Sequence, residues 1–148
     1  MRAYAARMLG STVESDDVVQ ETFVTAWSRI GELDDGTALK AWLLRILSRR
    51  CIDRMRRRRE TVEFSEVREL ETRDPSPDRA AEGSSALASL ARALDQLPEA
   101  QRRCWLLREV GNYTYQEIAD EMDLPVSTVR GYLARARRKL LEAMGDWR

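Results

Sequence analysis

Apolar residues recur every three to four positions along most of the chain, and no segment alternates between apolar and polar residues as a half-buried strand does. The first such stretch contains Tyr4, Met8 and Leu9, and we expect it to end at Gly10. Alanine, leucine, arginine and glutamate, all good helix formers, are abundant throughout. The pattern therefore predicts an all-α fold.

A second helix is predicted before Gly31, with Ser15 or Asp16 as its N-terminal cap. Its apolar positions follow helical spacing: Val19, Phe23, Val24, Trp27 and Ile30. We expect this set, Trp27 included, to face the core.

After a short acidic loop over 31–36, the pattern predicts a long amphipathic helix that runs into the arginines Arg56 to Arg59. Its inner face carries Leu39, Trp42, Leu43, Ile46, Leu47 and Ile52, and its outer face is cationic. Trp42 has two interpretations, because an aromatic in an apolar stripe usually belongs to the core but could also stack on a base. The arginine run either contacts phosphates or keeps the helix soluble, and we favour contact.

The helical pattern fails between Glu60 and Ser89, where prolines, glycine and serines interrupt an acidic stretch. We therefore predict two small helical domains, 1–60 and 90–148, joined by a flexible linker over 61–89. Such a linker reaches about 100 Å when extended at about 3.3 Å per residue.

The second domain reads as two helices separated at Pro98, followed by a helix-turn-helix. Thr114 and Glu117 have the spacing of a capping box at the start of a helix over 115–122. A turn containing Pro125 leads to a final helix over 127–144, and Ala119 supplies the small residue needed where the two helices cross.

Total charge alone suggests no nucleic-acid partner, because 25 Lys and Arg balance 25 Asp and Glu. The basic residues are nevertheless concentrated in two stretches, 40–59 and 130–139, the second of which contains no acid. Two separate basic patches indicate two places that contact phosphate. The alternative is that each is simply a solvated helix face.

The composition disfavours an enzyme, since the chain has no histidine, glycine-rich phosphate loop, nucleophile elbow or metal-ligand cluster. We expect no cofactor and no bound metal. Cys51 and Cys104 form no CxxC pair, and buried structural thiols are favoured over redox sensors. No apolar run has the length of a signal peptide or a membrane span, so a cytoplasmic protein is expected.

Three motifs carry a resemblance to a known family. The runs DDVVQETFVTAW and KAWLLRILSRRCIDRMRRRR resemble region two of extracytoplasmic-function (ECF) sigma factors. The segment from LDQLPEAQRRCWLL to YTYQEIADEMDLPVSTVRGYLARARRKL resembles their region four. The two matches occur in the family's order and cover most of the chain outside the linker.

The resemblance implies a factor that joins core RNA polymerase and gives it promoter specificity. Residues expected to dock on the clamp of the largest polymerase subunit are Asp17, Gln20, Glu21 and Phe23. Those expected to hold the melted minus-ten element are Thr37, Lys40, Trp42, Arg45, Arg49 and Arg50. Unpaired bases need stacking surfaces, and the melted strand needs cations for its phosphates.

Region four would read the minus-thirty-five element as duplex and touch the flap of the second-largest subunit. The expected contacts are Ser127, Thr128, Arg130, Gly131, Ala134, Arg135, Arg137, Arg138 and Lys139. Ser127 and Thr128 would hold a phosphate at the helix start, Arg130 and Arg135 would read bases, and the last three would contact the backbone. Gly131 and Ala134 permit close approach to the bases.

Family members are often inhibited by an anti-sigma factor, and we expect one here. The sequence departs from the family in its first helix, which looks shorter than usual. The rival interpretation is a two-domain transcriptional regulator, which predicts a self-complementary apolar face and a palindromic operator.

Overall fold

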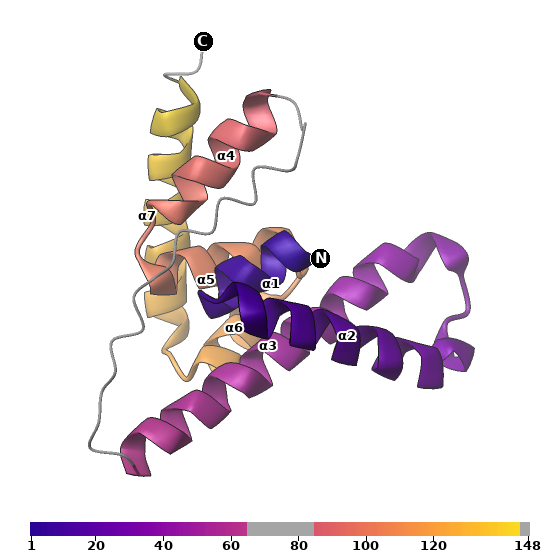
Figure 1. Cartoon of the computed structure of the whole chain (residues 1–148). Helices are drawn as coiled ribbons and strands as arrows, with labels where there is room; N and C mark the ends of the chain where they lie inside the picture. The colour runs from indigo at the N-terminus through magenta and orange to yellow at the C-terminus, as the bar shows by residue number, and fades with distance from the viewer. Residues whose placement is uncertain (65–84, 146–148) are drawn as a thin grey trace. The chain divides into compact units, whose positions relative to one another are not determined.

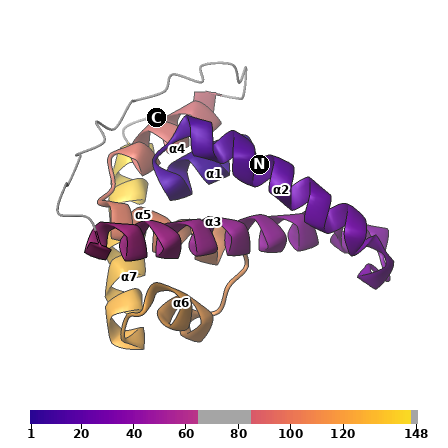
Figure 2. The same ribbon diagram turned by 60° about the horizontal axis from the view of Figure 1, so that its bottom comes forward.

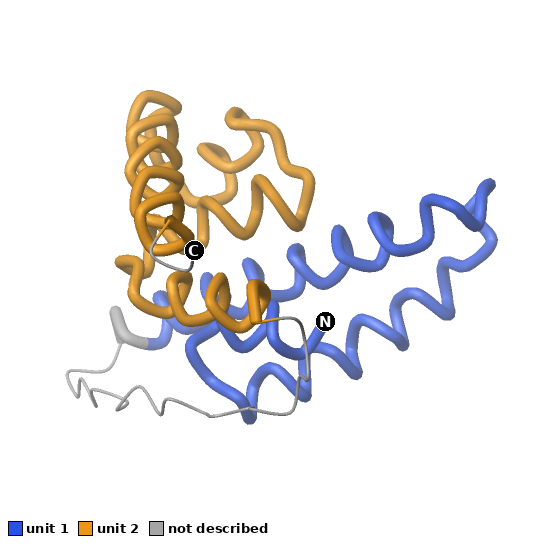
Figure 3. Tube along the Cα trace, turned by 90° about the horizontal axis from the view of Figure 1, so that it is seen from above, with its two compact units in different colours: residues 1–76 blue, residues 77–148 orange. Residues whose placement is uncertain are grey.

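The computed structural model describes residues 1–64 and 85–145. Within these two ranges the chain forms seven α-helices and two short 3-10 helices and no strand, which confirms the predicted all-α fold. The chain divides into two compact units, 1–76 and 77–148, which Figure 3 colours separately. Each unit is described below by itself.

In its described part, residues 1–64, the first unit consists of three α-helices, with α1 and α2 packed on each other and both lying against α3 (Figures 1 and 2). The helices are α1 (Arg2–Leu9), α2 (Thr12–Ser28) and α3 (Leu39–Phe64), and two 3-10 turns, Ile30–Glu32 and Gly36–Ala38, connect the last two. Gly10 ends α1 as predicted, with a φ of 70° that glycine adopts without strain.

The start of α2 differs from the prediction. Its N-terminal cap is Ser11, whose hydroxyl accepts a hydrogen bond of 3.3 Å from the backbone N–H of Glu14. Ser15 and Asp16, the predicted caps, lie within the helix instead. The helix ends at Ser28 and gives way to a 3-10 turn around Gly31. Several serines and acids in succession offered equally good caps, so local chemistry alone could not select among them.

The predicted inner face of α2 is also wrong. The buried residues are Ser15, Val18, Thr22 and Ala26, whereas Trp27 is 82% exposed. Small residues let α2 approach its neighbours closely, and their hydroxyls are satisfied within the helix. The Thr22 hydroxyl donates to the Val18 carbonyl at 2.7 Å, so its burial leaves no unpaired polar group there.

The core of the first unit is otherwise apolar. It contains Tyr4, Met8, Leu9, Val18, Leu47, Cys51, Ile52 and Met55. Tyr4 and Ser48 share a buried hydrogen bond of 2.5 Å between their hydroxyls, which links α1 to α3. This core holds the outer faces of α2 and α3 in fixed positions relative to each other.

In the second unit, α7 packs against all three preceding helices (Figure 1). The helices are α4 (Ser85–Asp95), α5 (Glu99–Glu109), α6 (Tyr115–Met122) and α7 (Val126–Gly145). Helices α3 and α4 extend into both ends of the predicted linker 61–89, and its remainder, 65–84, lies outside the described residues.

The capping box of α6 is confirmed. The Glu117 N–H donates to the Thr114 hydroxyl at 3.1 Å, and the Thr114 N–H donates to the Glu117 carboxylate at 2.8 Å. Ala119 is buried, as expected of the small residue where α6 and α7 meet. Asp123 takes the left-handed conformation at the end of α6, with φ 55°, and starts the turn to α7.

Candidate nucleic-acid interface

The outer face of α7 carries most of the residues predicted to contact duplex DNA. Its inward residues are Val129, Leu133, Ala136 and Leu140, all buried. At 100° per residue, the opposite face holds Ser127, Arg130, Gly131, Ala134 and Arg138. Ser127, Arg130, Ala134 and Arg138 are exposed. One side of the helix therefore packs in the core, and the other exposes polar, small and cationic residues to solvent.

Arg135 lies beside this face and folds back along the helix. Its guanidinium is 5.3 Å from the centroid of the Tyr132 ring, a cation–π geometry. A Cβ at Gly131 would lie 3.5 Å from two of the Arg135 guanidinium nitrogens. A methyl group at Gly131 would therefore be in ordinary van der Waals contact with the Arg135 guanidinium.

Arg137 differs from the other cations of α7, because its guanidinium is bound within the unit. One terminal nitrogen donates to the Tyr115 hydroxyl at 3.2 Å, and the other donates to the Glu109 carboxylate at 2.9 Å. These two bonds, that to Glu109 foremost, raise the pKa of the Arg137 guanidinium above its ordinary value. The predicted contact between Arg137 and the DNA backbone therefore competes with an internal pairing that the sequence did not reveal.

In the first unit, three arginines of α3 face α2. Arg50 donates to the Thr25 hydroxyl at 2.6 Å, and Arg54 donates to the Glu21 carboxylate at 2.9 Å. Four residues further on, Arg58 pairs with Glu14 and donates to the Leu9 carbonyl at 2.7 Å.

Because Arg50, Arg54 and Arg58 are spaced by four, they form one stripe along α3, and we call this stripe the α2–α3 ladder. The ladder gives part of the basic stretch 40–59 a structural role. Arg50, expected at the melted strand, and Arg58, favoured for phosphate contact, both belong to it.

A second face of α3 carries other residues predicted to hold the melted strand. Trp42, Arg45 and Arg49 follow each other at intervals of three and four residues, so they share one face that is distinct from the ladder. Trp42 is only partly buried, which leaves both of its interpretations open. The Arg49 guanidinium lies 3.9 Å from the Asp53 carboxylate, a long exposed ion pair.

Two further residues predicted at the melted strand precede this face. Thr37 lies in the second 3-10 turn, where its hydroxyl and N–H donate to the Asp35 carboxylate at 2.6 and 2.9 Å. These bonds, that from the hydroxyl first, lower the pKa of Asp35 below its ordinary value. Lys40 is exposed in the first turn of α3.

The residues predicted to bind polymerase lie on α2. Asp17, Gln20 and Phe23 are exposed, together with Val24 and Trp27, which the sequence analysis placed in the core. Their spacing puts all five on one outer face, polar near the helix start and apolar towards its end. The small residues Ser15, Thr22 and Ala26 at helical spacing were the signal that could have identified the buried face.

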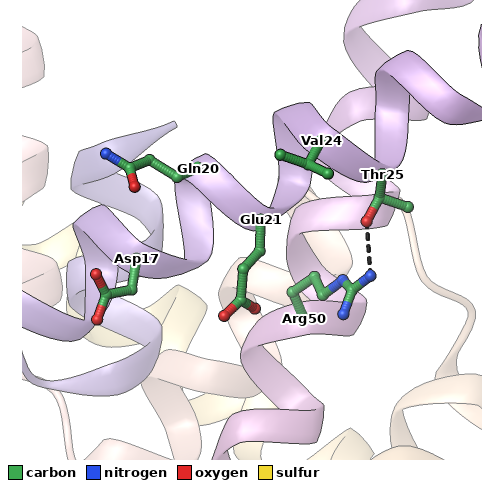
Figure 4. Close-up of a pocket in the computed structure, with 6 residues that line it drawn as sticks. All are labelled: Asp17, Gln20, Glu21, Val24, Thr25 and Arg50. Carbon is green, nitrogen blue, oxygen red and sulfur yellow. Dashed lines mark hydrogen bonds between the residues drawn. The ribbon is translucent and has the colours of Figure 1, made fainter.

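Glu21 is turned from this face towards α3 and lies beside a hollow of about 360 Å³ (Figure 4). The hollow is lined by Asp17, Gln20, Glu21, Val24, Thr25 and Arg50. Figure 4 shows Glu21 and Arg50 projecting from facing helices into the same space. Three predicted polymerase contacts and one predicted DNA contact are therefore brought together at a single place.

Both cysteines are fully buried, in agreement with structural thiols. Burial raises the pKa of the Cys104 thiol to about 11. Among residues 1–64 and 85–145, no group of side chains could hold a metal ion. None of the helices in that part of the chain is both long and apolar enough to span a membrane.

Two helical units, one of which contains a helix-turn-helix with a polar and cationic outer face, are the architecture typical of a two-part DNA-binding transcription factor. The family described as Sigma-70 region 2 matches residues 1–61, and the one described as Sigma-70, region 4 matches residues 87–140. The chain belongs to the ECF RNA polymerase sigma factors, which are transcription initiation factors and not enzymes.

Curated relatives and a solved structure agree with this assignment. ECF RNA polymerase sigma factor EcfG of Rhodopseudomonas palustris is 31% identical over 140 residues, which cover 95% of this chain and 76% of the relative. RNA polymerase sigma-H factor of Pseudomonas aeruginosa is 32% identical over 148 aligned positions, covering 93% of this chain and 77% of the relative. The sigma factor RpoE of Bartonella quintana, solved in complex with the anti-sigma factor NepR, superposes with a TM-score of 0.62 at 29% identity, covering 97% of this chain and 89% of that one.

Proposed function

We propose that this chain directs core RNA polymerase to promoters through two separate DNA contacts. In this proposal the first unit melts and holds the minus-ten element, and the second reads the minus-thirty-five element as duplex. The observation that carries it is the division of α7 into a buried apolar face and an exposed face with Ser127, Arg130 and Arg138. An exposed helix face of this composition fits the major groove, where arginine can read guanine with two hydrogen bonds.

The proposed upstream contacts follow that geometry. Arg130 and Arg135 read base edges, while Ser127 and Thr128 bind a phosphate at the N-terminus of α7. Arg138 and Lys139, both exposed, contact the backbone. Gly131 and Ala134 lack polar side chains, so they allow close approach or meet a thymine methyl.

For the melted element we propose the face of α3 that carries Trp42, Arg45 and Arg49, with Thr37 and Lys40 at its start. Cations on one helix face suit the phosphates of a single strand, and a partly exposed indole offers a stacking surface. Arg50 contributes indirectly in this scheme, because it holds α3 to Thr25 of α2.

We propose that the outer face of α2 docks on the clamp of the largest polymerase subunit. Exposed aromatic residues at a protein surface mark interaction sites, and Phe23 and Trp27 supply them here. Asp17 and Gln20 add polar contacts, whereas Glu21 supports the face through its ion pair with Arg54. The second unit would touch the flap of the second-largest subunit.

We also propose an anti-sigma factor as a regulatory partner. The support is the RpoE structure, in which a sigma factor similar to this chain is bound by the anti-sigma factor NepR. A protein that covers the outer faces of α2 and α7 would block polymerase docking and promoter recognition together.

Run-off transcription with purified core polymerase, with and without the chain, tests the proposal on genomic fragments. Transcripts that depend on the chain are expected. On a responsive fragment, Arg130→Ala should weaken upstream recognition, and Arg45→Ala should slow the opening of a promoter that is already bound. Arg92→Ala, which removes an exposed arginine of α4, is the matched control and should change neither step.

Two outcomes would contradict the proposal. Equal effects of Arg130→Ala and Arg45→Ala on binding and opening would contradict the division between the units. Tight binding of the free chain to a palindromic duplex, without stimulation of polymerase, would favour the two-domain regulator instead.

A further inference from the structure

The helix-turn-helix contains a cluster of side chains that contact one another within the second unit. Tyr115, the first residue of α6, is contacted by arginines of two other helices. The Arg108 guanidinium of α5 lies 5.0 Å from the centroid of the Tyr115 ring, and Arg137 of α7 donates to the Tyr115 hydroxyl at 3.2 Å. The Tyr115 side chain is thus held at its ring by α5 and at its hydroxyl by α7.

The same cluster links α5 to α7 directly. Glu109 is the last residue of α5, and its carboxylate accepts a 2.9 Å hydrogen bond from Arg137. Arg108 also donates to the Tyr113 carbonyl at 2.9 Å, which fixes the loop that leads into α6. A single guanidinium, that of Arg137, therefore joins the end of α5 and the beginning of α6 to the middle of α7.

Base readout depends on the rotation of α7 about its own axis and on its distance from the other helices of the second unit. Packing of Val129, Leu133 and Ala136 holds α7 in place but is non-directional. The bonds of Arg137 are directional, and they act about two turns after Arg130, on the same side of the helix.

We propose that Arg137 is a positioning residue, which uses Glu109 and Tyr115 to orient the recognition helix and does not serve as a phosphate ligand. This inference rests on the proposed function, in which α7 reads the upstream element. It also identifies Glu109 as a residue that supports promoter binding, although Glu109 carries the same charge as DNA.

Glu109 separates the two roles of Arg137 by the sign of its effect. If Arg137 binds phosphate, Glu109 competes with DNA for the guanidinium, and Glu109→Gln should leave promoter binding unchanged or strengthen it. If Arg137 positions α7, the same substitution breaks the bond that orients the helix, and promoter binding should fall.

The test uses holoenzyme that is assembled from core polymerase and a saturating excess of the full chain. The probe is a genomic fragment whose run-off transcription depends on the wild-type chain, and its affinity is measured at several KCl concentrations. We expect Glu109→Gln and Arg137→Gln each to lower affinity about two- to fivefold, the range for one partly exposed ion pair. The double variant should be no weaker than the weaker single variant, because both changes remove one interaction.

The salt dependence separates a positioning residue from a phosphate ligand, because the loss of a phosphate contact reduces the slope. Lys139→Gln removes an exposed cation of α7 and should reduce the slope of log affinity against log salt by about 0.9, as the loss of one phosphate contact does. Glu109→Gln and Arg137→Gln should keep the wild-type slope. All variants should retain the helical circular dichroism and cooperative melting of the wild type.

Unchanged or increased affinity of Glu109→Gln would overturn the inference, as would a reduced salt slope of Arg137→Gln. If Arg130→Ala and Lys139→Gln both leave affinity unchanged on the same fragment, α7 does not read it, and the proposed function and this inference fail together. If these two variants weaken binding while Glu109→Gln does not, only the positioning role fails.

Discussion

Replacing Trp27 with alanine distinguishes a core residue from a docking residue. Because Trp27 is 82% exposed, folding removes only about a fifth of its surface from water. Taking about 250 Å² for a tryptophan side chain and about 25 cal/mol per Å², Trp27→Ala should cost at most about 1 kcal/mol of unfolding free energy. A buried tryptophan would cost about 3–5 kcal/mol.

The same substitution should strongly weaken the complex with core polymerase. An exposed tryptophan that becomes buried at an interface is worth about 2 kcal/mol or more, which corresponds to an affinity loss of about 30-fold. Urea unfolding followed by far-ultraviolet circular dichroism measures the first effect, and competition against a labelled wild-type chain for core polymerase measures the second.

Two controls calibrate these measurements. Leu47→Ala truncates a fully buried residue of α3 and should cost about 2–5 kcal/mol of stability. Leu87→Ala removes an apolar side chain that is 61% exposed on α4, in the other unit, and should change stability and affinity little. A stability loss of 3 kcal/mol or more for Trp27→Ala, as judged against the roughly 3–5 kcal/mol of a core tryptophan, would refute its exposed placement. Unchanged affinity at unchanged stability would refute the docking face.

Two further predictions concern the second unit. Gly131→Ala should raise stability by about 0.5–1 kcal/mol in urea unfolding, since alanine is the better helix former. The same change should lower affinity for a responsive promoter fragment, because it adds a methyl group to the outer face of α7. Tighter promoter binding would contradict a close approach of Gly131 to the bases. Because burial raises the pKa of Cys104 to about 11, its contribution to stability should be complete below the thiol's ordinary pKa and be lost as pH rises towards 11. Between pH 8 and pH 10 the wild type should therefore lose about 1 kcal/mol more than Cys104→Ala in urea unfolding, and parallel losses would contradict the burial of the thiol.

Features that depend on a few neighbouring residues were predictable from the sequence. The capping box of Thr114 and Glu117 and the ending of α1 at Gly10 need only local backbone geometry. The order of buried and exposed positions on α7 was also readable, because its leucines and valine alternate with arginines at helical spacing. These features were enough to predict an all-α fold and a helix-turn-helix.

Assignments that depend on a neighbouring helix were not predictable in the same way. Hydrophobicity placed Trp27 and Val24 in the core, but α1 and α3 pack against the small residues Ser15, Thr22 and Ala26. From the sequence, the arginines of α3 were predicted to form one cationic surface. The structure separates the ladder residues Arg50, Arg54 and Arg58, which bind α2 and the end of α1, from the face of Arg45 and Arg49.

By itself, then, the sequence determined where helices form and which stretches are basic, because propensity, capping and periodicity act over a few residues. Only the tertiary structure decided which arginines of α3 bind α2 and the end of α1, and which face of α2 is exposed. The physical reason is that the role of a guanidinium depends on the group that it contacts, and that group is far away in the sequence. The partners of Arg50 and Arg54 are 25 and 33 residues away, and those of Arg137 are 22 and 28 residues away.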